Sequence, residues 1–222
     1  MVQQGSSHRD GVQVASGNDL QHSAPTMTGP TLPLPVQSGR LTLRWYRDED
    51  MEGLFALQSD SGQLAYVPFD VRTREEVAEH LAWRLSNRTL SEPDDRLGVA
   101  VIRTDDGAYL GDLVIFFQSA ENQGGEIGYM LLAGHQGKGY ATEAVTGLLD
   151  LAFGSLGLRR IVAHIDARNS SSAAVAERVG MRLEAQHVED EHFKGEWTDS
   201  LIYAMLRSEW EKRRSAYPVG KG

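Results

Sequence analysis

The sequence predicts an α+β fold in which one mixed, mostly antiparallel central sheet is flanked by helices on both faces. Three strand-like runs lie between positions 97 and 131, and the short glycine-containing turns between them are typical of an antiparallel meander. From position 141 onward, helical and strand patterns alternate along the chain. The length of 222 residues, with 41% hydrophobic and 24% charged residues, fits one globular domain with short tails.

The first 38 residues differ in composition from the rest of the chain. They are rich in Gly, Ser, Gln, Thr and Pro and show neither helical nor strand periodicity. Prolines at four positions between 25 and 35 would interrupt any regular element. We therefore expect a flexible tail over residues 1–38, a single domain over 39–214 and a frayed tail over 215–222.

The domain is expected to begin with a strand followed by two helices. Alternation over 41–45 predicts the strand, and Asp48 is placed to cap the first helix. Thr73 and Glu76 have the spacing of a capping box, which predicts the start of the second helix. The remaining elements are expected, in order, as strands 97–103, 109–117 and 126–131, helix 141–156, strand 160–166, helix 169–180, and strands 181–188 and 200–206.

The composition excludes several classes of function. Without cysteine there is no disulfide, thiolate nucleophile or cysteine metal site, and no histidine spacing indicates a metal site either. The net charge of −9 argues against nucleic acid and anionic membranes as partners. No apolar run reaches the length of a membrane span and the N-terminus lacks a signal-peptide pattern, so we expect a cytoplasmic protein.

The run at 135–144, His-Gln-Gly-Lys-Gly-Tyr-Ala-Thr-Glu-Ala, carries the strongest functional signal. It lies between a predicted strand and a predicted helix, where glycines let backbone N–H groups face an anion at the helix N-terminus. Its spacing differs from the P-loop and from dinucleotide-binding motifs. A simple glycine turn is the alternative. The candidate ligand-binding residues are Gln136, Gly137, Lys138, Gly139, Tyr140 and Ala141.

The pattern Gln136-x-x-Gly139-x-Ala141 resembles the Q/R-x-x-G-x-G/A signature of the GNAT superfamily of N-acyltransferases. Supporting runs are Glu-Ile-Gly-Tyr from position 126, Asn-x-x-Ser from 169 and Gly-Met-Arg-Leu-Glu from 180. The resemblance covers about residues 40–210, and within the superfamily it is greatest to the RimJ/RimL-like branch. It implies a GNAT-like fold and acetyl-CoA or another acyl-CoA as co-substrate, with its pyrophosphate on this loop.

The resemblance also implies roles for two catalytic candidates, Glu126 and Ser172. Glu126 would deprotonate the incoming amine, directly or through water, because a protonated amine has no lone pair for attack. A charged strand-edge residue is the alternative. Ser172 would lie near the thioester sulfur and help to protonate the leaving thiolate, or hold a water that does so. The adjacent Ser171 would take this place if the alignment shifted by one residue.

Further residues are assigned to the pantetheine arm by the same resemblance. The strand carrying Tyr129, Met130 and Leu131 would separate from strand 160–166 and receive the arm, with N–H groups near Met130 polarising the thioester carbonyl. Core packing is the alternative for Tyr129 and Met130. Asn169 would contact the pantetheine amides and can also cap the following helix.

The acceptor is expected to be a primary amine, on a protein N-terminus, a lysine or a small molecule such as a polyamine or an antibiotic. The acidic chain would weakly favour a cationic acceptor. A catalytically silent acyl-CoA-binding module and an unrelated phosphate binder are the alternatives. The donor remains acetyl or a larger acyl such as succinyl, and a homo-oligomer is compatible with family habit. Possible acceptor contacts are Tyr66, Phe69, Trp83, His187, His192, Phe193 and Trp197; His164 is expected to be structural.

Overall fold

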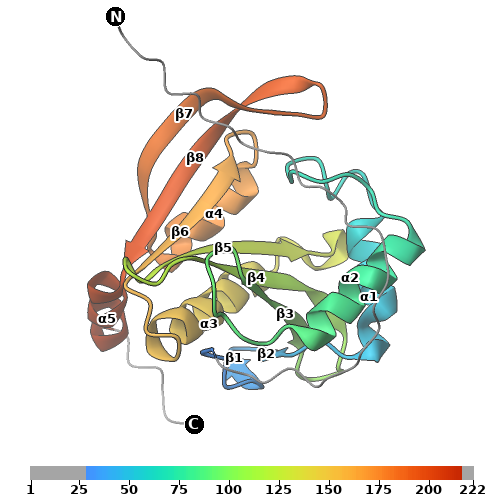
Figure 1. Ribbon diagram of the computed structural model, residues 1–222, viewed down its shortest axis with the longest axis horizontal. Helices are drawn as coiled ribbons and strands as arrows, with labels where there is room; N and C mark the ends of the chain where they lie inside the picture. The colour runs from blue at the N-terminus through green and yellow to red at the C-terminus, as the bar shows by residue number, and fades with distance from the viewer. Residues whose placement is uncertain (1–28, 217–222) are drawn as a thin grey trace, which may run out of the picture.

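The computed structural model describes residues 29–216, and within this range eight strands form one sheet in the order β1-β2-β3-β4-β5-β6-β8-β7 (Figure 1). All neighbouring strands are antiparallel except β5 and β6, which are parallel. This confirms the predicted mixed, mostly antiparallel sheet. The strands are β1 Val36–Ser38, β2 Leu41–Arg44, β3 Arg96–Arg103, β4 Tyr109–Ser119, β5 Gly124–Leu131, β6 Arg160–Asp166, β7 Arg182–Phe193 and β8 Glu196–Leu206.

Helices cover both faces of the sheet, as the sequence predicts. Because strand side chains alternate between the two faces, Leu97, Val99 and Val101 of β3 join the larger core with residues of α3 and α4. Ala100 and Ile102 join a smaller cluster with residues of α1 and α2 on the opposite face. The helices are α1 Met51–Gln58, α2 Arg74–Ser86, α3 Tyr140–Gly154, α4 Ser170–Val179 and α5 Arg207–Ala216.

The helix starts test the local capping predictions. The capping box of α2 is confirmed, because Glu76 N donates to Thr73 Oγ1 at 3.2 Å and Thr73 N donates to Glu76 Oε2 at 2.8 Å. The predicted Asp48 cap is wrong, because Asp48 begins a short 3₁₀ turn that precedes α1. The capping carboxylate is that of Asp50, which accepts a hydrogen bond from Arg47 N at 2.8 Å.

The N-terminal boundary lies earlier than the predicted position 38. Val36–Ser38 form strand β1 beside β2, and Leu32 is 2% exposed within the larger core. Short apolar residues between prolines pack here although they show no periodicity. The rest of the predicted tail, residues 1–28, lies outside the described residues. At the other end α5 continues to Ala216, and 217–222 lie outside the described residues.

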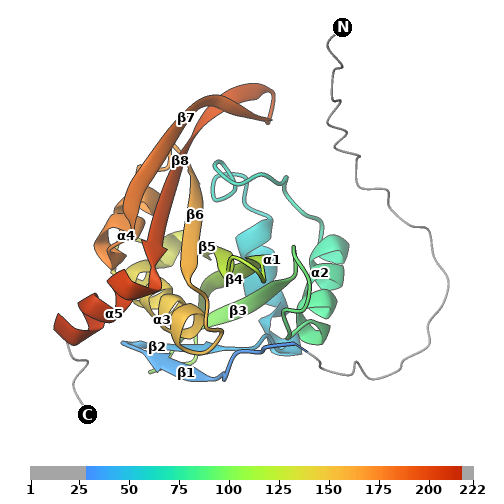
Figure 2. The ribbon, with the colours of Figure 1, turned by 60° about the vertical axis from the view of Figure 1, so that its left-hand side comes forward.

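The last two strands are longer than predicted and form a projecting hairpin (Figure 2). The sequence predicts a loop between 188 and 200, but pairing continues to Phe193 and Glu196 around a turn at Lys194 and Gly195, both with positive φ. Charged residues on this exposed hairpin hide the apolar alternation that marks a strand. Lys194 Nζ donates to the carbonyl of Leu64, which links the hairpin to segment 59–73.

Candidate active site

The sheet opens between its two parallel strands. Pairing of β5 with β6 covers Gly124 to Glu126 and ends at the Glu126–Val162 pair. Beyond this point β5 continues to Leu131 and β6 to Asp166 without a ladder between them. The strand separation implied by the resemblance is therefore present. The backbone of β5 after Glu126 offers N–H and C=O groups on this side for an extended ligand.

The glycine-rich loop follows β5 and leads into α3. Gly137 has φ +71° and Gly139, the N-cap of α3, has φ +83°, a backbone region that side chains with a β-carbon rarely adopt. The first N–H groups of α3 have no partner within the helix. Together with the positive end of the helix dipole, they form a site suited to phosphate.

An ion pair that the sequence analysis missed fixes this loop. The Arg40 Nε atom donates to Glu143 Oε1 at 2.9 Å, and Arg40 Nη2 donates to the carbonyl of Lys138 at 2.7 Å. The same guanidinium carbon lies 4.3 Å from the centroid of the Tyr140 ring. Arg40 and Glu143 are 103 positions apart in the chain, so no local pattern could have paired them.

Two predicted loop side chains bond to nearby backbone. The Nε2 atom of Gln136 donates to the carbonyl of Leu131 at 2.9 Å, which ties the loop to the end of β5. Lys138 Nζ donates to the carbonyl of Gly134 at 2.7 Å and stays exposed on the loop. Tyr140 is 7% exposed and belongs to the larger core. The loop therefore offers an anion mainly its backbone, with the exposed Lys138 as an added charge.

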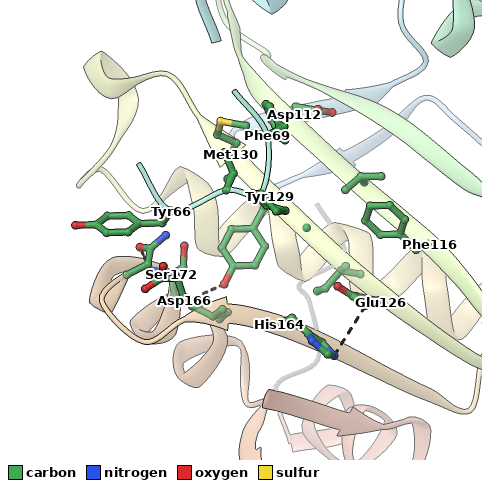
Figure 3. A pocket seen from close by; sticks show the side chains of 18 of the residues that line it. Tyr66, Phe69, Asp112, Phe116, Glu126, Tyr129, Met130, His164, Asp166 and Ser172 are labelled. Atoms are coloured by element: carbon green, nitrogen blue, oxygen red, sulfur yellow. Dashed lines mark hydrogen bonds and ion pairs between the residues drawn. The ribbon is translucent and has the colours of Figure 1, made fainter. Parts of the chain in front are cut away.

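A cavity of about 700 Å³ lies on the α1/α2 side of the opening (Figure 3). It brings together five of the predicted site residues: Glu126, Tyr129, Met130, Asn169 and Ser172. Leu131 and the loop residues 136–141 lie outside its lining, at the continuation of β5. The cavity and the glycine-rich loop are thus two separate parts of the candidate site, joined by the second half of β5.

Only some of the proposed acceptor contacts reach this cavity. Tyr66 and Phe69 line it, as Figure 3 shows, whereas Trp83, His187, His192 and Trp197 do not. Trp83 instead stacks on His80, and the ring of Trp197, 61% exposed, packs edge-on against His192. The side chain of Phe193 lies outside the described part of the structure.

Glu126 projects into the cavity beside His164. Gln118 Nε2 donates to Glu126 Oε2 at 3.1 Å, and His164 Nε2 lies 4.0 Å from the same oxygen. Burial raises the pKa of Glu126 above its usual value; His164 and Gln118 oppose this, and Glu191 adds to it. His164, which the sequence predicts to be structural, lines the cavity two residues beyond Val162, the register partner of Glu126.

Tyr129, Asn169 and Ser172 are held to one another. Tyr129 Oη donates to the carbonyl of Ser172 at 2.7 Å, and Ser172 N donates to Asn169 Oδ1 at 3.0 Å. Asn169 therefore caps α4, the structural alternative considered for it, while it also lines the cavity. Burial raises the pKa of Tyr129, so its hydroxyl stays protonated and fixed as a donor.

A buried ion pair on the α1/α2 face was not predicted. Arg84 and Asp112, 5% and 6% exposed, are joined by two hydrogen bonds of 2.8 and 2.5 Å. Gly98 makes room for this pair, because a β-carbon there would lie 2.0 Å from Arg84 Nη1. An aspartate inside the apolar run of β4 was the available signal, since a buried acid needs a partner.

Residues 29–216 contain neither a candidate metal-binding cluster nor a helix that could span a membrane. Their His, Asp and Glu side chains form no group of three or more that could hold a metal ion. None of the helices in this range is long and apolar enough to cross a membrane.

Comparison with known proteins gives a family match. The model of the acetyltransferase (GNAT) domain matches residues 40–182. An uncharacterized N-acetyltransferase of Bacillus subtilis, YnaD, is 29% identical over 175 residues, which cover 79% of this chain and 98% of the relative.

Solved structures show the same fold. A GNAT-family acetyltransferase from Bacillus anthracis has a TM-score of 0.71 at 27% identity and covers 79% of this chain and 100% of its own. A spermidine N-acetyltransferase from Vibrio cholerae, solved with CoA and spermine, has a TM-score of 0.68 at 20% identity, covering 78% and 98%. At this identity the second structure is evidence for the fold alone.

Proposed function

The chain belongs to the GNAT acetyltransferase family, and we propose that it transfers an acyl group from acyl-CoA to a primary amine by direct attack in a ternary complex. One observation carries the proposal. The opening between β5 and β6 has a helix N-terminus at one end and a cavity with a half-buried carboxylate, Glu126, beside it. This arrangement provides separate places for a phosphate, an extended arm and an amine.

The residues present fit an acyl-CoA. Backbone N–H groups of Gly137, Gly139 and the first turn of α3 would bind the pyrophosphate, with Lys138 as an added charge. The free edge of β5 at Tyr129, Met130 and Leu131 would bond the pantetheine amides, with Asn169 across the opening. An N–H group near Met130 would polarise the thioester carbonyl.

We assign the proton transfers to the two polar residues of the cavity. Glu126 would accept a proton from the ammonium, directly or through water, and the raised pKa that burial gives it brings it closer to that of an amine. The free amine then attacks the carbonyl carbon, the C–N bond forms, and the C–S bond breaks as the thiolate leaves. The attacking nitrogen must lose a second proton as the amide forms, and Ser172, which lines the cavity, would relay this proton to the thiolate, or hold a water that does so.

The acceptor is proposed to be a protein N-terminal α-amine or a lysine, because the sequence runs resemble the RimJ/RimL-like branch most. An α-amine is deprotonated more easily, with a pKa of about 8 against about 10.4 for lysine. A small amine is the second candidate; the likeness to the spermidine enzyme supports it only through the fold.

Ligand-induced stabilisation tests the first half of the proposal. Coenzyme A, acetyl-CoA or succinyl-CoA at about 100 times its dissociation constant should add about 2.7 kcal/mol to the free energy of unfolding, and ATP should add little. The absence of a shift with every CoA compound at millimolar concentration would contradict acyl-CoA binding.

Thiol release with an amine present tests the second half. An enzyme releases free CoA in proportion to acylated amine, whereas a silent binding module shows the thermal shift without thiol release. Comparison of acetyl-CoA with succinyl-CoA in the same assay identifies the preferred acyl group.

A further inference from the structure

The cavity contains a half-buried cation whose charge is not neutralised. Arg72 lines the cavity just before α2, and no ion pair formed by the described residues, 29–216, includes it. Its Nη1 donates to Gln58 Oε1 at 2.8 Å and lies 2.5 Å from His80 Nδ1. Its guanidinium carbon lies 4.7 Å from the centroid of the Phe69 ring. All three partners are neutral groups.

His80 is neutral for a physical reason. Burial and the nearby charges of Arg84, Arg72 and Arg96 lower the pKa of His80 to about 3. Its Nδ1 can therefore accept a hydrogen bond from Arg72 near neutral pH. The side chain of Gln58, 1% exposed, and the bond from Arg72 N to the Gln58 carbonyl at 3.0 Å hold Arg72 in place. The cation is thus prepositioned, which reduces the entropy lost when it binds a ligand.

Two further guanidinium groups line the same end of the cavity. Arg84 is neutralised by Asp112, yet its Nε is buried without a hydrogen-bond partner among the described residues. Arg96 stacks 4.7 Å from the centroid of Trp83 and, like Arg72, takes part in none of the ion pairs within 29–216. Arg72 and Arg96 therefore leave this end of the cavity positive although the chain carries a net charge of −9.

The carboxylates that remain lie on other walls of the cavity. Asp166 at the end of β6 is paired with Arg168, Glu126 extends from β5 and Glu191 from β7. Arg72 precedes α2 and Arg96 begins β3. The cavity is therefore polarised, with a cationic wall from α2 and β3 and acidic groups from β5 and β7. A purely cationic acceptor such as a polyamine would match only the acidic groups and would meet Arg72 with repulsion.

We propose that Arg72, with Arg96 beside it, binds a carboxylate of the substrate while the reacting amine lies at Glu126. This inference rests on the proposed acyl transfer and deepens it. A planar guanidinium matches a carboxylate with two parallel hydrogen bonds, which a neutral group cannot replace. The carboxylate has two possible sources: an amine acceptor that carries one, as an amino acid or an acidic peptide does, or a dicarboxylic acyl group such as succinyl on the donor.

Direct binding of a carboxylate tests the site itself. Succinate should raise the melting temperature more than succinamide at equal ionic strength, and Arg72→Gln should weaken succinate binding about tenfold or more, the loss expected for a charge-assisted hydrogen bond. Arg74→Gln is the matched control, because Arg74 lies two positions away, pairs with Glu52 and does not line the cavity. Arg72→Lys should fall between the wild type and Arg72→Gln.

Turnover assays separate the two sources. The first assay uses acetyl-CoA and measures kcat/KM of the wild type and Arg72→Gln for two amines that carry a carboxylate, β-alanine and glycylglycine, and for their neutral amides. The second assay uses the neutral amides as acceptors and compares kcat/KM with acetyl-CoA and with succinyl-CoA. If Arg72→Gln lowers kcat/KM about tenfold only for the carboxylate-bearing amines, the acceptor carries the group. If Arg72→Gln lowers kcat/KM only with succinyl-CoA, the acyl donor carries the carboxylate.

Three results would overturn this inference: no preference of the wild type for succinate over succinamide, equal succinate binding by Arg72→Gln and Arg74→Gln, or an equal loss of kcat/KM with charged and neutral substrates. In each case the acetyl-CoA thermal shift should persist. Loss of that shift in the wild type would instead contradict the proposed acyl transfer, so the two failures are distinguishable. Arg96→Gln, a change at an exposed residue, repeats the test if Arg72→Gln does not fold.

Discussion

The two faces of the sheet are built in different ways. The α3/α4 face is an apolar core that ends in a loop whose ligand groups are mainly backbone N–H groups. The α1/α2 face has a small apolar cluster, and beside it a cavity lined by charged side chains from α2, β3, β4, β5, β6 and β7. A common co-substrate can be bound by backbone geometry, whereas the acceptor must be selected by side chains. In the proposed function, the first face would bind the acyl-CoA that the family shares, and the second would select the acceptor.

The largest effect is expected where the α1/α2 face buries charge. Arg84→Met leaves Asp112 buried without its partner, so the free energy of unfolding should fall by about 3–5 kcal/mol in urea titrations. The double variant Arg84→Met/Asp112→Leu should recover most of this loss, because neither charge remains. Similar losses in the single and double variants would show that packing, and not charge, supports this face.

The second prediction separates chemistry from co-substrate binding. Glu126→Gln should lower kcat about 100-fold, a typical contribution of a general base, and leave the acetyl-CoA thermal shift intact. In the wild type kcat/KM should rise as the pH increases through the raised pKa of Glu126, because only the ionised carboxylate accepts a proton. This rise of kcat/KM with pH should be absent in Glu126→Gln. An unchanged kcat would remove Glu126 from the mechanism.

The third prediction concerns the backbone of the α3/α4 face. Gly139→Val places a side chain at φ +83° and should cost roughly 1–2 kcal/mol of stability and weaken coenzyme A binding. Gly157→Val is the matched control, because Gly157 has φ +70° with open space around it and follows the C-terminal end of α3, at the opposite end of this helix from the loop. It should lose similar stability but bind coenzyme A normally. Equal coenzyme A binding by both variants would contradict phosphate binding by the loop before α3.

The smallest effect is expected from the neutral histidine of the α1/α2 face. The pKa of His80 is about 3 in the folded state, whereas its ordinary value, which applies in the unfolded chain, is 6.5. Below pH 6.5 the unfolded chain therefore binds a proton that the folded chain does not. The free energy of unfolding should therefore decrease as pH falls from 6.5 toward 3, by no more than about 1 kcal/mol at pH 5.5 after allowance for partial exposure. His80→Gln should show a correspondingly smaller decrease. Equal pH dependence in both proteins would exclude a neutral, half-buried His80.

Sequence reasoning succeeded where a few consecutive residues fix the backbone. The α2 capping box, the Asn169 start of α4 and the glycines before α3 are each determined within one or two turns of chain. It failed where long-range packing overrides a local pattern. Strand β1 forms directly after Pro35 because β2 provides its partner, and the β7–β8 hairpin continues through charged residues because the two strands pair with each other.

The sequence by itself determined the fold class and the place of the glycine-containing loop before α3, and it singled out Glu126, Asn169 and Ser172 as candidates, because each rests on a short motif or periodicity. Only the tertiary structure decided which side chains share the cavity. It brought His164 to Glu126, Arg84 to Asp112 and Arg72 to Gln58 and His80. These contacts join residues from different helices and strands, whose distances depend on how the elements pack and leave no periodic trace in the chain.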